Sequence, residues 1–181
     1  MPVKLYDEKW MRRTFTRMAE TARTLLRPGA RAALVGVRTR GAEMADRLAA
    51  ELRAMGTETQ VGYLDPTMFR DDLSTGAGLK DILPTAIDFD LNGAEVILVD
   101  DVLLTGRSVR AAMEALFHYG RPGAIRLCVM VDRGGRELPI QPDICGMRID
   151  VSEGAWVRVK LRETDKCEDA VYVMGAGDEE P

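Results

Sequence analysis

The string VILVDDVLLTGRS, at residues 96–108, constrains the fold of this chain more than any other segment. Its apolar run is typical of a central parallel strand buried on both faces, where polar and apolar residues need not alternate. Asp100 and Asp101 interrupt the run, which puts a polar break at the carboxyl end of the strand. From Ser108, apolar residues recur at helical spacing up to Gly120. The string therefore predicts a strand, a loop and a helix.

The loop after the aspartates has the composition of an anion site. Residues 105–108 (TGRS) bring backbone N–H groups and hydroxyls to the start of the helix, where a phosphate oxyanion can bind. Asp100 and Asp101 repel phosphate, but their oxygens can accept hydrogen bonds from sugar hydroxyls or from a hydrated divalent cation. Hydroxyls next to a phosphate indicate a ribose phosphate. The alternative is an ordinary strand end with two solvated aspartates, although neither a dinucleotide-binding nor a P-loop fingerprint is present.

Composition favours a small enzyme of one domain spanning residues 1–181. With 181 residues and 46% hydrophobic residues, the chain can bury one core. The three cysteines form no C-x-x-C pair, which argues against a disulfide framework and a zinc site. No apolar stretch is long enough to cross a bilayer, so we expect a cytoplasmic protein without a membrane partner. The formal charge of -4 argues against indiscriminate nucleic-acid binding.

Strands and helices alternate along the chain, which predicts an α/β fold with a doubly wound, mostly parallel sheet. Ligands of such sheets bind beyond the carboxyl ends of the strands. Asp7 is expected to cap a first helix that ends before Pro28. The other elements are expected as strands at 32–37, 59–63, 94–99, 125–131, 155–161 and 170–174, and as helices at about 42–55 and from 108 onward.

The remaining segments are predicted to be irregular. Residues 65–92 form a polar stretch in which 68–83 are expected to be a mobile loop, and 85–91 can pair as a hairpin. Residues 132–155, rich in glycine and proline, are expected to form a small irregular hood. Residues 175–181 are expected to fray.

Two further loops are expected to meet the first at the same edge of the sheet. Residues 36–41 (GVRTRG) follow a strand and carry two cations, which suits a pyrophosphate; a solvated basic turn is the alternative. Residues 67–72 (TMFRDD) include an arginine on an arm that can close over a substrate and exclude water. On composition alone, a plain surface loop is the favoured interpretation of this third segment.

These motifs carry a resemblance to a known family. GVRTRG, TMFRDDL, VILVDDVLLTGRS and VDRGGRELP occur in the order and spacing seen in the pyrimidine operon attenuation regulators that are also uracil phosphoribosyltransferases, within the type I phosphoribosyltransferases. The similarity covers residues 11 to about 173. It implies that the chain uses Mg²⁺ and converts phosphoribosyl diphosphate (PRPP) and uracil to UMP and pyrophosphate. It also implies UMP-dependent binding of pyrimidine operon leader mRNA, which attenuates transcription, and a homo-oligomer of two or more copies.

The resemblance also implies roles for individual residues. Asp100, Asp101 and Arg70 are the expected catalytic residues, and Mg²⁺ is expected to be held mainly by substrate and water, without direct protein ligands. Relatives have a non-proline cis peptide bond in the loop at 38–40. No strong base is needed, because the reaction develops charge at ribose C1 and on the leaving group, so His118 is expected to be structural. The residues expected to bind PRPP are Arg38, Thr39, Arg40, Asp100, Asp101, Val102, Leu103, Leu104, Thr105, Gly106, Arg107 and Ser108.

Base recognition is expected in the hood, where backbone groups match the N–H donor of uracil between its two carbonyl acceptors. Asp132 and Arg133 are the expected base-binding residues. The sequence departs from its relatives here: they usually have histidine at Gly135, and a lysine–asparagine pair at residues 147–148 (Met-Arg). A further departure is Leu104, where relatives have tyrosine. A purine phosphoribosyltransferase is therefore an alternative.

RNA binding is predicted on the first helix. Arg13, Arg17 and Arg27 are expected to share a face that binds phosphates. Glu20 lies on the same face, where RNA-binding relatives have histidine, and its carboxylate repels phosphate. A solvated basic face or a subunit contact is an equally good interpretation. A UMP-sensing RNA-binding protein with little catalysis is the alternative from another functional class.

Overall fold

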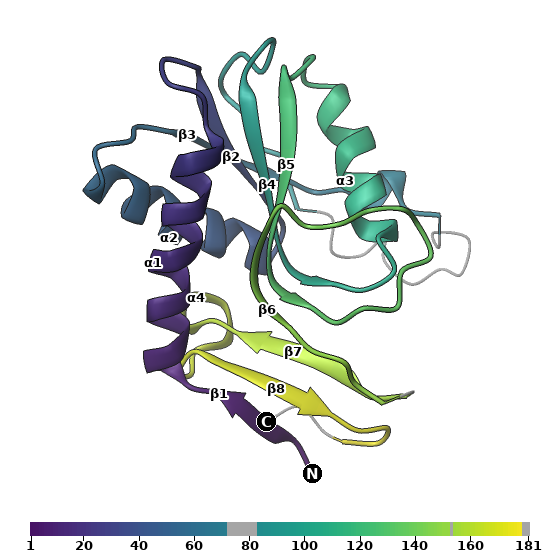
Figure 1. Cartoon of the computed structure of the whole chain (residues 1–181). Helices are drawn as coiled ribbons and strands as arrows, with labels where there is room; N and C mark the ends of the chain where they lie inside the picture. The colour runs from purple at the N-terminus through teal and green to yellow at the C-terminus, as the bar shows by residue number, and fades with distance from the viewer. Residues whose placement is uncertain (72–82, 153, 179–181) are drawn as a thin grey trace.

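The computed structural model describes residues 1–71, 83–152 and 154–178, and within them a five-stranded sheet forms the main body. The strand order is β3-β2-β4-β5-β6, and every neighbouring pair is parallel (Figure 1). The predicted α/β class is therefore confirmed. The strands are β2 (Ala32–Val37), β3 (Gln60–Leu64), β4 (Glu95–Leu103), β5 (Ala124–Asp132) and β6 (Ile144–Arg148).

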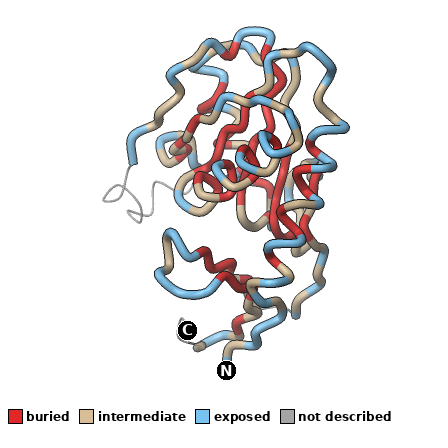
Figure 2. Tube along the Cα trace, turned by 90° about the vertical axis from the view of Figure 1, so that its left-hand side faces the viewer, coloured by how far each residue is buried: buried red, intermediate tan, exposed pale blue. Residues whose placement is uncertain are grey.

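Helices cover both faces of this sheet. Alternate residues of each strand belong to different core clusters: Leu34 and Ile97 pack with helices α1 (Glu8–Leu25) and α2 (Arg40–Ala54), whereas Val35 packs with α3 (Arg107–Phe117). Figure 2 shows the buried residues concentrated along these strands and on the helix faces turned toward them. As predicted, Asp7 caps α1, because its Oδ1 accepts a hydrogen bond from the backbone N–H of Trp10 at 2.9 Å.

A second, three-stranded antiparallel sheet, with the order β1-β8-β7, lies at one end of the described molecule (Figure 1). Val159 and Val171 pack into the same core cluster as α1 and α2. Sequence patterns predicted two of these strands but missed β1. The elements are β1 (Val3–Tyr6), β7 (Trp156–Lys160), the short helix α4 (Arg162–Asp165) and β8 (Ala170–Met174).

The strand that carries the aspartates is longer than predicted. We expected it to end at Val99, but β4 continues to Leu103, with Asp100 paired to Val129 on β5. The prediction was wrong because backbone hydrogen bonds to β5 are made whatever the polarity of the side chains. The aspartates thus belong to the rigid sheet.

The segments predicted to be irregular are partly ordered. Residues 144–148, inside the expected hood, form the edge strand β6 of the main sheet, so the hood is smaller than 132–155. A single bridge between Tyr63 and Ala86 takes the place of the expected hairpin at 85–91. Within the expected tail, Asp178 accepts a hydrogen bond from the Gly175 N–H at 2.8 Å. Most of the expected mobile loop, residues 72–82, lies outside the described residues, as do 179–181.

Among the residues that the structure describes, none of the helices is both long and apolar enough to cross a membrane.

Candidate active site

A cavity of about 270 Å³ opens at the carboxyl ends of β2 and β4. Three loops contribute to it, as predicted: the one after β2, the one that contains η1 (Thr67–Phe69), and the start of α3. Ligands of doubly wound sheets bind at this edge. The described residues that line the cavity are Val37, Arg38, Thr39, Asp65, Pro66, Thr67, Arg70, Leu83, Asp100, Asp101, Val102 and Ser108.

Asp100 and Asp101 form an acidic pair on the floor of this cavity. Asp100 is buried and accepts a hydrogen bond from the Asp101 N–H at 2.9 Å, and Asp101 accepts one from the Val102 N–H at 2.9 Å. Burial and the neighbouring charge of Asp101 raise the pKa of Asp100 well above its usual value. Burial also raises the pKa of Asp101, although the positive charge of Arg40 opposes that rise. A ligand that brings hydrogen-bond donors or positive charge would therefore stabilise the ionised form of this pair.

Two glycines allow the ends of the loop between β2 and α2 to pack closely. A Cβ on Gly36 would lie 2.4 Å from the Gly41 carbonyl oxygen, and a Cβ on Gly41 would lie 2.4 Å from the Val99 carbonyl oxygen. The loop ends therefore pack on each other and on β4 beside the acidic pair. The Arg38–Thr39 peptide bond is cis, as the resemblance predicted. This packing sets Arg38 and Thr39 on the cavity wall.

Arg40 is not among the described residues that line this cavity. Its guanidinium makes a two-pronged ion pair with Asp165 of α4, with Nη2–Oδ1 at 2.6 Å and Nε–Oδ2 at 3.1 Å. Both side chains are largely buried. We expected Arg38, Thr39 and Arg40 to act together on a pyrophosphate, but the cavity is lined by Arg38 and Thr39, while Arg40 pairs with Asp165 of α4, in the segment between β7 and β8.

The phosphate-binding loop predicted from the sequence has the expected backbone. Gly106 precedes α3 with a φ of 91°, a conformation that favours glycine. Thr105 accepts a hydrogen bond from the Arg107 N–H at 3.2 Å, and Ser108 lines the cavity. The Arg107 guanidinium donates instead to Asp71 and to Glu137, each at 2.6 Å. Backbone N–H groups and the hydroxyls of Thr105 and Ser108 can thus donate here to an anion.

Asp65 organises the arm that carries Arg70, and sequence reasoning missed it. Its Oδ1 accepts the Thr67 N–H at 2.8 Å and its Oδ2 accepts the Leu83 N–H at 2.6 Å, so one carboxylate holds both described ends of the arm. Asp65 follows β3 directly and precedes a proline, a combination typical of turn initiation. Arg70 lines the cavity, and its charge acts on Asp100.

One of the two expected base-binding residues lines a second hollow, of about 240 Å³. Asp132 lines it and pairs with Arg136 at 2.6 Å and with Arg148 at 3.4 Å, whereas Arg133 is not among the described residues that line either cavity. Arg136, which sequence analysis missed, also donates to the Leu104 carbonyl oxygen at 2.8 Å. This bond connects the hood to the loop that the sequence predicted to bind phosphate.

The basic stripe predicted on α1 is smaller than expected. Arg27 lies beyond the end of α1, and its backbone N–H and Nε both donate to the buried Glu95. The prediction that Arg27 shares a helix face with Arg13 and Arg17 was therefore wrong, because α1 ends before Arg27 and the ion pair with Glu95 turns the Arg27 side chain toward the sheet. Arg17 donates to the Gly146 carbonyl oxygen. His118 ends α3 and packs its ring against Phe69, with ring centroids 4.9 Å apart.

Comparison with known proteins places the chain in a family. A model described as "Phosphoribosyl transferase domain" matches residues 6–161. Proteins named "Bifunctional protein PyrR" are similar: one from Synechococcus sp. is 53% identical over 133 residues, covering 73% of this chain and 72% of the relative. Another, from Deinococcus radiodurans, is 47% identical over 156 residues, covering 86% and 85%. A third, from Listeria monocytogenes, is 44% identical over 179 residues, covering 94% and 96%.

Solved structures agree on the fold. A ternary substrate complex of a hypoxanthine phosphoribosyltransferase variant from Trypanosoma cruzi superimposes with a TM-score of 0.71 at 19% identity, covering 94% of each chain. One from Staphylococcus aureus gives 0.67 at 17% identity, covering 93% of this chain and 90% of that one. At these identities the likeness establishes the architecture alone. Together with the family match over residues 6–161, it means that this chain belongs to the phosphoribosyl transferase domain family, among the bifunctional PyrR proteins.

Proposed function

We propose that this chain is a uracil phosphoribosyltransferase that also regulates pyrimidine biosynthesis genes. The transferase would convert PRPP and uracil to UMP and pyrophosphate. The observation that carries the proposal is the convergence, in one cavity, of the acidic pair Asp100–Asp101, the Arg38–Thr39 loop and the amino end of α3. These are receptors for the sugar hydroxyls, the pyrophosphate and the 5-phosphate of one substrate.

The chemistry requires charge stabilisation. The bond between ribose C1 and the pyrophosphate oxygen breaks, and the bonding electrons leave with pyrophosphate. The uracil nitrogen forms the new bond to C1 and loses its proton, which passes to the departing pyrophosphate or to water. Positive charge develops on the ribose, and Asp100 and Asp101 beneath it stabilise that charge while accepting hydrogen bonds from the 2- and 3-hydroxyls. Arg70 and the Arg38–Thr39 loop would stabilise the growing negative charge on pyrophosphate. Backbone N–H groups at residues 105–108 would hold the 5-phosphate.

The residues present fit Mg²⁺ as a substrate-bound ion. Among the described residues, no group of three or more histidine, cysteine, aspartate or glutamate side chains could enclose a metal. The cavity offers the carboxylates of Asp100 and Asp101, enough for an ion that keeps several waters and is held mainly by substrate phosphates. When bound, Mg²⁺ would supply positive charge that neutralises the pyrophosphate. The chain's own contribution would be to orient the sugar hydroxyls.

An assay with isotope-labelled uracil, PRPP and Mg²⁺ tests the enzymatic half. We expect UMP formation by the wild-type protein and a loss of about 10²–10³-fold in kcat for Asp101→Asn and for Arg70→Ala, since each removes a group that stabilises developing charge. Asp88→Asn and Arg121→Ala, at exposed positions away from the cavity, are the matched controls. Wild-type rates in both site variants would refute the assignment, and faster turnover of hypoxanthine or guanine than of uracil would establish the purine alternative.

The regulatory half rests on the name of the relatives and on the exposed Arg13 and Arg17 of α1. We propose that the protein, as a homo-oligomer in the cytoplasm, binds pyrimidine operon leader mRNA when UMP is present. A gel shift of that RNA should be stimulated by UMP and weakened by salt. A strong shift without UMP synthesis in the same preparation would establish the regulator with little catalysis. Absence of a shift, with catalysis intact, would restrict the protein to its enzymatic role.

A further inference from the structure

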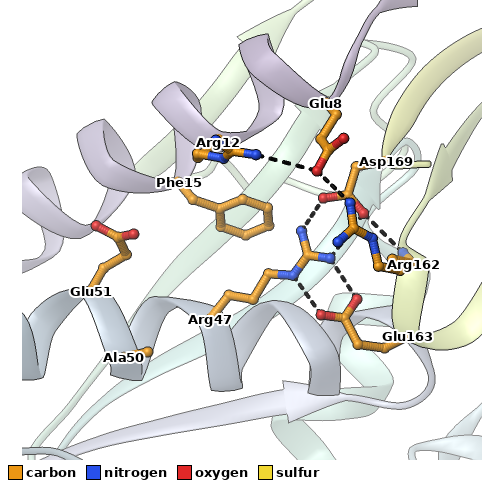
Figure 3. Close-up of a pocket in the computed structure, with 9 residues that line it drawn as sticks. All are labelled: Glu8, Arg12, Phe15, Arg47, Ala50, Glu51, Arg162, Glu163 and Asp169. Carbon is orange, nitrogen blue, oxygen red and sulfur yellow. Dashed lines mark hydrogen bonds and ion pairs between the residues drawn. The ribbon is translucent and has the colours of Figure 1, made fainter.

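Ion pairs attach the segment between β7 and β8 to α2 beside a cavity of about 320 Å³ (Figure 3). The Arg47 guanidinium lies between two carboxylates, with Nε–Glu163 Oε1 and Nη2–Asp169 Oδ1 both at 2.9 Å. It also lies over the Phe15 ring, 5.2 Å from its centroid. Carboxylates of the chain itself therefore surround the Arg47 guanidinium, and the cluster acts as an attachment between elements far apart in the sequence.

A second attachment lies on the same side of α2, at its first residue. Arg40 and Arg47 are seven positions apart, which is close to two helical turns, so they share a face of the helix. Arg40 pairs with Asp165 at the end of α4, as described above. The segment from α4 to Asp169 thus holds α2 at two points, and the Asp165 contact is the one adjacent to the Arg38–Thr39 loop.

Asp165 is itself held in place. Its Oδ2 accepts a hydrogen bond from the Leu161 N–H at 2.9 Å, which fixes the carboxylate toward Arg40. Burial alone would raise its pKa, but the hydrogen bonds from Arg40 and Leu161 and the nearby positive charges outweigh burial and lower the pKa. Asp165 therefore stays ionised at neutral pH. The guanidinium fork and the carboxylate make a directional contact that a single-point ion pair would not provide.

The start of α2 has little freedom once this contact is made. On one side Gly41 touches β4 beside Asp100, and on the other side Arg40 is held by Asp165. Arg38 and Thr39 immediately precede this fixed point and line the cavity. Loss of either contact would let the loop shift relative to Asp100.

We propose that Asp165 is a positioning residue for the pyrophosphate-binding loop: by holding Arg40, it fixes the start of α2 and with it Arg38 and Thr39, so that the second sheet takes part in substrate binding. The inference rests on the proposed transferase function. It assigns no contact between Asp165 and substrate. Its effect should be specific to PRPP, because uracil is expected in the hood, whose hollow shares no described lining residue with the cavity that Arg38 and Thr39 line.

Asp165→Asn is the test, with Glu163→Gln as the matched control on the same short helix. Both remove one negative charge that pairs with an arginine of α2, but Glu163 contacts Arg47, two turns away from the loop. Calorimetry with PRPP and Mg²⁺ gives the affinity without requiring turnover, and steady-state kinetics gives KM for each substrate. We expect Asp165→Asn to weaken PRPP binding and raise its KM about tenfold, with the KM for uracil changed less than about twofold. Glu163→Gln should keep wild-type PRPP affinity.

Several outcomes would overturn the inference. Asp165→Asn with wild-type PRPP affinity would do so, and so would an equal loss of affinity in Glu163→Gln, which would indicate general loosening of the second sheet. If Asp165→Asn does not fold, Arg40→Lys replaces it in the test. Lysine keeps the positive charge but lacks the two-pronged guanidinium, so this variant should show the same selective loss of PRPP affinity. Unchanged PRPP affinity in Arg40→Lys would refute the inference. If the wild-type protein binds no PRPP, the proposed function is refuted. If the wild-type protein binds PRPP and Asp165→Asn binds it equally well, only the positioning role is refuted.

Discussion

Replacing Gly41 by alanine should displace the active-site loop by a predictable amount. The added Cβ would lie 2.4 Å from the Val99 carbonyl oxygen, whereas ordinary van der Waals contact begins at 3.4 Å, so the start of α2 and β4 must separate by about 1 Å. Overpacking of this kind costs about 1–3 kcal/mol, and the better helix propensity of alanine offsets about 1 kcal/mol of it. The net loss of about 0–2 kcal/mol lowers Tm by up to about 8 °C for a chain of this size.

The catalytic effect should be larger than the effect on stability. A displacement of about 1 Å at a substrate-positioning element costs roughly 10²-fold in rate. We would measure Tm by thermal unfolding, and kcat and the KM for PRPP by UMP formation. Gly56→Ala is the control: Gly56 has a φ of 78° with nothing within 4 Å of the added Cβ, so alanine there costs about 1–2 kcal/mol through backbone conformation and leaves the loop alone. If Gly41→Ala keeps wild-type kcat and KM, the packing argument fails.

Three further predictions concern charge and reactivity. Burial and the neighbouring aspartate raise the pKa of Asp100 in the folded protein, so at any pH above the pKa of this carboxyl in the unfolded chain its ionisation opposes folding. Asp100→Asn should therefore raise Tm at pH 7 while abolishing turnover. A lower Tm would contradict this. The pKa of buried Glu95 is lowered by hydrogen bonds from the backbone and side chain of Arg27, so its contribution is present at neutral pH and is lost as pH falls through the folded-state pKa. Glu95→Gln should cost about 1.5–3 kcal/mol in urea unfolding at pH 7 and should differ less from wild type in acid. Burial raises the pKa of the Cys128 thiol, so brief alkylation of the folded protein should modify exposed Cys167 and spare Cys128, as read by mass spectrometry; equal labelling would refute the burial argument.

Local patterns were enough to locate the three loops of the candidate site. The apolar run before Asp100 and the glycine before α3 are short-range signals, since burial and backbone conformation depend on neighbouring residues. Asp65 carried a weaker local signal, a turn-forming residue before proline, whose role appeared once both ends of the arm were seen on its carboxylate. The length of β4 was misjudged because polar side chains suggested an end where backbone pairing continues.

By itself, the sequence determined the α/β class, the order of the strands and helices from β2 to β5, and the positions of the acidic pair and of the two loops proposed to bind anions. These follow from hydrophobic period, glycine positions and residue chemistry within a few positions. Only the tertiary structure decided what each charged side chain meets. Arg40 reads in sequence as part of a basic loop, but it is held by Asp165, 125 positions away. Periodicity and spacing contain no information about such a pair, because the partner is selected by how the second sheet packs against α2.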